Sequence, residues 1–162
     1  MGSYTEGLIR LVGERSPLKV LADTPSRLED LYWELKDKKL SNSYGEGKWT
    51  ARQILAHLTD SESTYGFRVR LALAQDHPTI QPYDQDAWVN LYRQGIDASL
   101  AVEVFRSLRT WNLALFRTLT AEQLSRGAFH PERGEEPVAM MIALLAGHDL
   151  NHLAQLERIV AS

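Results

Sequence analysis

Apolar residues recur at intervals of three and four along four long segments of the sequence, and strict alternation of apolar and polar residues is almost absent. Those intervals place apolar side chains on one face of an α-helix, whereas alternation would indicate a strand. The 162 residues include 44% hydrophobic residues, enough for one buried core. We therefore predict an all-α protein, a single domain over residues 1–162 that folds as an up-and-down four-helix bundle.

Local signals mark where the expected helices begin. Thr50, with Gln53 three residues later, forms a capping box and predicts a helix start at Thr50. Thr24 followed by Pro25 is a similar signal, so we expect the first long helix to begin there. Pro137 is suited to open the last helix.

Three stretches outside these helices contain turn-forming residues. The segment HPERGEEP, residues 130–137, is predicted to be a loop. Residues 78–95 read as an extended connection with one short helical turn, and residues 4–22 as a short helix broken by Pro17. The connection at 78–95 is long for a bundle, and unusually long connections are often functional.

Charge and composition exclude several classes of protein. The 18 basic and 21 acidic residues are spread along the chain, so no concentrated positive face is expected to bind nucleic acid. No apolar run approaches the roughly 20 residues of a membrane span. The first residues lack a signal-peptide segment, so we expect a cytoplasmic protein without membrane contact. Because the chain has no cysteine, any metal site must use imidazole, carboxylate or water ligands.

Two histidines lie four residues apart in the most apolar helical segment, LLAGHDLNHLAQLERI, residues 144–159. Four residues correspond to about 6 Å of rise and about 40° of turn, so His148 and His152 can direct their rings at one point. His57 falls on the inward face of the helix expected from Thr50 and can supply a third ligand. The pattern predicts a divalent-metal site, for which zinc is best suited and Ni²⁺, Fe²⁺ or Mn²⁺ are alternatives.

The alternative is that these histidines are ordinary core residues. A single histidine on an apolar helix face is usually hydrogen-bonded inside the core and binds no metal. Three unsatisfied buried imidazoles would each cost about 1–3 kcal/mol, which a shared cation would offset. Three protein ligands also leave positions for water or for an anionic substrate such as a thiolate, which is typical of a catalytic zinc site.

Three further residues are candidates for proton transfer. Asp60 and Glu62 follow His57 closely, and either could orient its imidazole or act as a base. The alternative is that both form a solvated acidic edge of the helix. His130 could reach over the open end of the site or lie in a surface turn. The aromatic residues within 83–92 could line a substrate mouth or simply cover the core.

Three stretches of the chain together resemble the DinB-like superfamily, which includes damage-inducible proteins and metal-dependent hydrolases. They are KWTARQILAHLTDSE, PYDQDAWVNLY and FHPERGEEPVAMMIALLAGHDLNHLAQLERI, in the expected order over residues 28–159. The elements W-(S/T)-x-x-x-x-(L/I)-x-H-(L/I) and H-D-x-x-H-x-x-Q are specific when they occur together. The resemblance implies an up-and-down four-helix bundle, often dimeric, with a metal bound by His57, His148 and His152. It also implies relatives that are thiol S-transferases using bacillithiol or mycothiol.

These observations predict an enzyme. We expect a metal-dependent hydrolase or a low-molecular-weight-thiol S-transferase that acts on a small-molecule substrate and forms a homodimer. One alternative is a non-catalytic stress-response bundle whose metal only joins the helices. Another is a small-ligand-binding module that uses the aromatic residues within 83–92.

Overall fold

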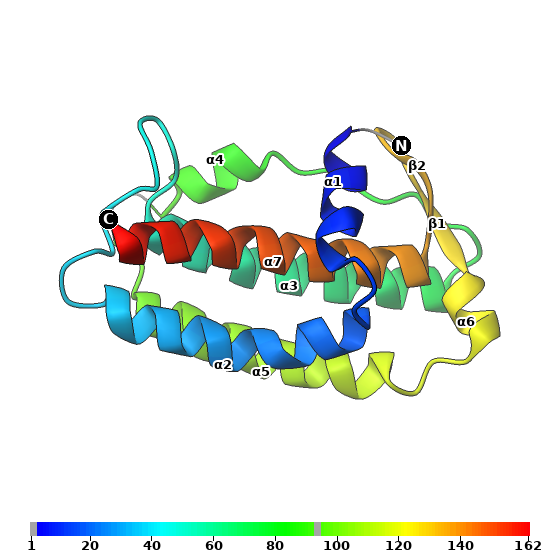
Figure 1. Ribbon diagram of the computed structural model, residues 1–162. Coiled ribbons are helices and arrows are strands. Elements are labelled where there is room, and N and C mark those ends of the chain that lie inside the picture. Colours follow the sequence, from blue (N-terminus) through cyan, green and yellow to red (C-terminus); the bar gives the residue numbers. More distant parts are fainter. Residues whose placement is uncertain (1–2, 93–94) are drawn as a thin grey trace.

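The computed structural model describes residues 3–92 and 95–162, and four long helices form its centre (Figure 1). They are α2 (Pro17–Leu35), α3 (Ala51–Ala74), α5 (Ala98–Phe116) and α7 (Val138–Ala161). The shorter elements are α1 (Ser3–Val12), α4 (Gln85–Asn90), α6 (Ala121–Ser125) and the strands β1 (Gly127–His130) and β2 (Gly134–Pro137). The predicted four-helix bundle is therefore confirmed.

The four long helices run in two directions. One apolar cluster joins the beginnings of α2 and α7 to the ends of α3 and α5, and a second cluster joins the opposite ends. The pairs α2–α3 and α5–α7 are thus up and down, whereas α3 and α5 are parallel neighbours. Parallel neighbouring helices need a connection that runs the length of the bundle, and the segment that contains α4 supplies it (Figure 1). This explains the long connection that the sequence shows at 78–95.

Helix α1 lies across α7 and packs closely on it (Figure 1). The two backbones approach closely at Gly147, where a Cβ atom would overlap the backbone carbonyl of Leu8. A glycine there lets the two backbones touch. Because Gly147 directly precedes His148, α1 covers the bundle beside that histidine.

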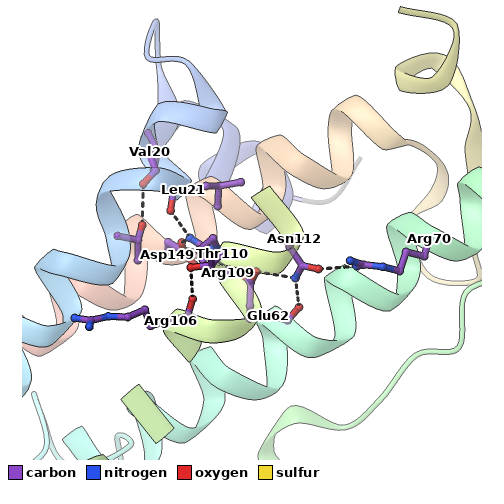
Figure 2. A network of polar contacts seen from close by, with 10 residues as sticks. Val20, Leu21, Glu62, Arg70, Arg106, Arg109, Thr110, Asn112 and Asp149 are labelled. Carbon is purple, nitrogen blue, oxygen red and sulfur yellow. Dashed lines mark hydrogen bonds and ion pairs between the residues drawn. The ribbon is translucent and has the colours of Figure 1, made fainter. Parts of the chain in front are cut away.

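Helix α2 begins at Pro17, so the expected start at Thr24 is wrong. Thr24 lies inside the helix, where its hydroxyl donates to the Val20 carbonyl at 2.9 Å. Pro25 has no N–H and leaves the Leu21 carbonyl without its helical donor. Arg109 of α5 donates to that carbonyl at 2.8 Å instead (Figure 2). A hydrogen bond from another helix therefore compensates for the proline inside α2. Such a contact between distant segments cannot be read from the local sequence signals for helix ends.

The predicted loop at 130–137 is also wrong in part, because β1 and β2 form an antiparallel hairpin around it. Strand β1 is tied to the α3–α4 connection by two backbone hydrogen bonds, from Ile80 to the Phe129 carbonyl and from Phe129 to the Pro78 carbonyl. Strands of four residues are too short to show a clear alternating pattern. The hairpin places His130 in the protein interior.

Other local expectations hold. The Thr50 hydroxyl accepts from the Gln53 amide, and the Gln53 side chain accepts from the Thr50 amide, as a capping box requires. The short helical turn expected between 78 and 95 is α4. Within the part of the chain that the structure describes, no helix is both long and apolar enough to span a membrane.

We expect Gly147→Ala to reduce the free energy of unfolding by about 1–3 kcal/mol, because the added methyl group must push α1 away from α7. Gly7→Ala is a matched control within α1, since a Cβ there meets nothing within 4 Å. It should leave stability unchanged or raise it by about 0.5–1 kcal/mol. Urea denaturation measures both variants, and equal effects would contradict the close contact of α1 and α7.

Candidate metal centre

Helices α3 and α7 bring His57, His148 and His152 together inside the bundle. The capping box fixes the start of α3, so His57 faces inward two turns later. All three side chains are buried, and one ring nitrogen from each lies within 4.8 Å of the others. The ring centroids are 4.4–4.9 Å apart. The predicted convergence of the three imidazoles is therefore present in the structure.

All three histidines are held in the neutral form. Burial, aided by the neighbouring His152, lowers the pKa of His57 to about 3. Burial lowers the pKa of His152 to about 4 and that of His148 well below its usual value. Neutral imidazoles have a free lone pair at pH 7, which is the form that binds a metal.

Two residues outside the trio orient it. His152 Nδ1 lies 2.8 Å from Gln155 Oε1, so this nitrogen donates its proton and leaves Nε2 free as a ligand atom. The Trp49 ring packs against His57 at 4.7 Å and stacks on His152 at 5.9 Å between centroids. Its indole N–H donates to Asp86 Oδ1 of α4. The sequence prediction missed both roles, although the three-residue spacing of Gln155 from His152 could have indicated one.

The trio has the features of a donor set for a divalent cation. Nε2 of His57 lies 2.8 Å from Nε2 of His148, close enough that two unprotonated nitrogens would repel. Nδ1 of His148 is buried and has no hydrogen-bond partner among residues 3–92 and 95–162. A cation that accepts the three lone pairs would remove the repulsion. These residues therefore fit a bound metal.

Glu62, one of the predicted proton-transfer residues, belongs to a buried polar network that faces α5 (Figure 2). Its Oε2 accepts from Arg109 at 2.6 Å, and its Oε1 accepts from Asn112 at 2.8 Å. Arg109 also pairs with Asp149 of α7 at 2.8 Å. Both carboxylate oxygens of Glu62 are thus engaged by α5, and none of these contacts reaches a histidine.

Asp60 lies on the side of α3 that faces the α4 segment. Its Oδ1 accepts from the Tyr92 hydroxyl at 3.0 Å, while its buried Oδ2 has no partner among the described residues. Burial raises the pKa of Asp60, and burial together with this hydrogen bond raises the pKa of Tyr92 to about 12. Asp60 therefore contacts the segment that joins α3 to α5, through its hydrogen bond with Tyr92.

His130 shares a cavity with His148, one member of the trio. This cavity of about 470 Å³ is bounded by the hairpin, α1, α3 and α7, and both His130 and His148 line it. A second cavity, of about 360 Å³, is lined by His152 and Trp49. The histidine cluster can therefore be approached from two sides.

A sequence model of the DinB superfamily matches residues 21–156, which is most of the chain. The protein belongs to the DinB superfamily. It is 32% identical over 144 residues to YfiT of Bacillus subtilis, covering 88% of this chain and 81% of that protein. A relative in Oceanobacillus iheyensis is 31% identical over 136 residues, covering 84% and 79%. Both relatives carry the name "putative metal-dependent hydrolase".

Solved structures agree with this membership. The structure of Bacillus subtilis YfiT, described as having an unusual four-helix bundle topology, matches with a TM-score of 0.84 and 31% identity. The match covers 88% of this chain and 83% of YfiT. The mycothiol-dependent maleylpyruvate isomerase matches with a TM-score of 0.71 over 86% of this chain and 59% of that one. At 11% identity, this second match shows that the two proteins share a fold.

The lowered pKa values predict that the DinB bundle loses stability in acid. Between pH 7 and pH 5 the unfolded chain protonates its histidines, whose usual pKa is 6.5, whereas His57 and His152 stay neutral in the folded protein. Each of the two should lower the free energy of unfolding by about 2 kcal/mol at pH 5 in metal-free protein. Urea denaturation of chelator-treated protein at both pH values measures this loss.

His152→Asn removes one of these groups, so the loss between pH 7 and pH 5 should shrink by about 2 kcal/mol. His77→Asn is the matched control, because His77 is exposed and its hydrogen bond to Glu135 raises its pKa, so its removal should not shrink the loss. An unchanged loss in the His152 variant would contradict a buried neutral imidazole at that position.

Proposed function

We propose that this DinB-superfamily protein is a metal-dependent hydrolase of small molecules that holds zinc through His57, His148 and His152. The convergence of three neutral imidazoles supports it most strongly, since no fourth protein ligand joins the cluster within the described residues. A zinc ion with open positions acts as a Lewis acid and lowers the pKa of a water or thiol that it binds. The names of the relatives agree with this activity.

The remaining residues of the site orient ligands and exclude water. Gln155 fixes the ring of His152, and Trp49 covers the cluster from the α4 side. Of the three residues expected to transfer protons, His130 lines the cavity that contains His148, while Asp60 and Glu62 do not. We propose His130 as the proton-transfer residue, and burial lowers its pKa so that the ring is neutral at pH 7.

A thiol S-transferase is the second candidate, and one observation favours it. Two cavities meet the cluster, one beside His148 and one beside His152, and Tyr4 and Gln85 line both. A transfer between two substrates needs two such approaches, whereas hydrolysis needs one substrate and water. We also propose that the chain acts as a homodimer in the cytoplasm, as the sequence predicts.

We expect purified wild-type protein to bind about one zinc ion per chain and to melt at a higher temperature with zinc than after chelation. His148→Ala should abolish stoichiometric binding, because two imidazoles bind the ion far more weakly than three. His77→Ala is the matched control, since His77 lies at the surface away from the cluster. Elemental analysis and calorimetry check this, and equal zinc content in the two variants would contradict the site.

The reaction is tested by two assays on the zinc-loaded protein. We expect hydrolysis of an activated ester such as 4-nitrophenyl acetate to fall at least about 100-fold in His148→Ala. The alternative reaction is measured as conjugation of bacillithiol to 1-chloro-2,4-dinitrobenzene, and zinc-dependent turnover in that assay alone would favour the transferase. Zinc binding that raises the melting temperature without either activity would support a non-catalytic, metal-stabilised bundle.

A further inference from the structure

Arg68 is a buried arginine in the wall of the cavity beside His148. Its residue surface is only 5% exposed, yet it lines the cavity together with Ser61 and Tyr65. One nitrogen, Nη2, donates to the Gln81 carbonyl at 2.9 Å. Within residues 3–92 and 95–162, no carboxylate lies at ion-pairing distance from it. The protein therefore buries a positive charge that has no direct ion pair, and the Glu136 carboxylate acts on it only through space.

Among the described residues, Arg109 is also a buried arginine, and its surroundings differ from those of Arg68. Arg109 pairs with Glu62 and Asp149, so its charge is compensated inside the bundle. A buried cation without such partners costs several kcal/mol of desolvation. Burial lowers the pKa of Arg68, but a guanidinium remains charged at neutral pH. A bound anion would offset the cost that the protein leaves uncompensated.

The other charged residues that line the cavity do not form an ion pair with Arg68. Arg133 lines the same cavity, but its guanidinium pairs with the buried carboxylate of Glu136. Two carboxylates, Asp84 and Glu132, lie at the exposed rim, and Asp84 caps α4 by accepting from the Ala87 amide. The guanidinium of Arg68 is therefore the buried cation that faces the cavity without a carboxylate partner.

The geometry of α3 connects this charge to the histidines. Ser61 and Arg68 are seven residues apart, two helical turns, so they lie on one face with about 10 Å of rise between them. Helical side chains lean toward the N-terminus, which directs Arg68 toward Ser61. The Ser61 hydroxyl lies 3.4 Å from His57 Nε2. A small molecule in this cavity can thus reach from Arg68 to the imidazole cluster.

The tyrosines beside Arg68 limit its movement. Its guanidinium lies 5.7 Å from the ring centroids of both Tyr65 and Tyr83. A planar guanidinium held in this way presents its remaining N–H groups in a fixed direction, which suits two parallel hydrogen bonds to a carboxylate or phosphate.

We propose that Arg68 binds an anionic group, a carboxylate or a phosphate, of the small-molecule substrate. Arg68 holds that group at one end of the cavity and the bond to be cleaved or formed lies beside the histidines at the other end. This inference deepens the proposed function and rests on it for the identity of the reacting site. It predicts that small organic anions are preferred substrates, and that a neutral activated ester is only a poor substitute for them.

Isothermal titration calorimetry with succinate, inorganic phosphate and neutral succinamide tests the proposal on chelator-treated and on zinc-loaded protein. We expect succinate or phosphate to bind the wild type with a Kd near 1 mM or lower in both samples, and succinamide at least about tenfold more weakly. Comparison of the first two probes distinguishes a carboxylate site from a phosphate site. Binding in metal-free protein separates Arg68 from anions that bind zinc directly.

Arg68→Met should weaken anion binding at least about tenfold, and Arg68→Lys should retain part of it because the charge remains but the paired donors are lost. Arg158→Met is the matched control, since it removes one positive charge from the exposed end of α7. Circular dichroism checks the folding of each variant. If Arg68→Met does not fold, the preference of wild-type protein for succinate over succinamide and the response of Arg68→Lys still decide the question.

Three results would overturn the proposal. They are equal anion affinity in Arg68→Met and wild type, an equal loss in Arg158→Met, or equal affinity of wild-type protein for succinate and succinamide. The zinc content of the same samples reports on the proposed function separately. Zinc binding without anion binding would refute the anion site alone, and anion binding without zinc would refute the metal-dependent reaction alone.

Discussion

A buried arginine fixes the relative positions of the four long helices (Figure 2). Arg109 of α5 donates to Glu62 of α3 and to the backbone of α2, and it pairs with Asp149 of α7. Removing one partner from a buried ion pair typically costs about 3–5 kcal/mol, so these contacts oppose sliding of any helix. Asp149 directly follows His148, and Glu62 lies five residues after His57. The same contacts therefore hold α3 and α7 in the register that brings the two histidines together.

Arg68 and Arg109, the two buried arginines among the described residues, have different surroundings and, we infer, different roles. Arg109 finds its counter-charges inside the protein and stabilises the bundle, whereas Arg68 faces a cavity beside His148 without one. The imidazole cluster is similar, because Nε2 of His57 and Nε2 of His148 lie only 2.8 Å apart and Nδ1 of His148 has no hydrogen-bond partner among the described residues. Several buried polar groups that lack hydrogen-bond or ion-pair partners and lie close together are typical of a ligand-binding site.

How much the sequence could predict depends on whether a feature is local. The Thr50 capping box and the inward face of His57 follow from residues a few positions apart, and both predictions were confirmed. The start of α2 was mispredicted because Arg109, from another helix, donates a hydrogen bond to the Leu21 carbonyl that Pro25 leaves without a donor. The hairpin was missed because its four-residue strands depend on pairing with each other and with the α3–α4 connection. Arg68 has no sequence signal at all, since its lack of a partner is a property of the folded cavity.

The sequence by itself determined that this chain forms amphipathic helices and which three histidines point into their core, because both follow from the 3.6-residue period of a single helix. Only the tertiary structure decided that α3 and α5 run in parallel, that Glu62 serves a buried ion network and that Arg68 lines the cavity beside His148. The physical reason is that burial and charge compensation depend on neighbours from distant segments. A side chain's periodic position gives its direction, but the packing of the other helices decides whether it finds a partner.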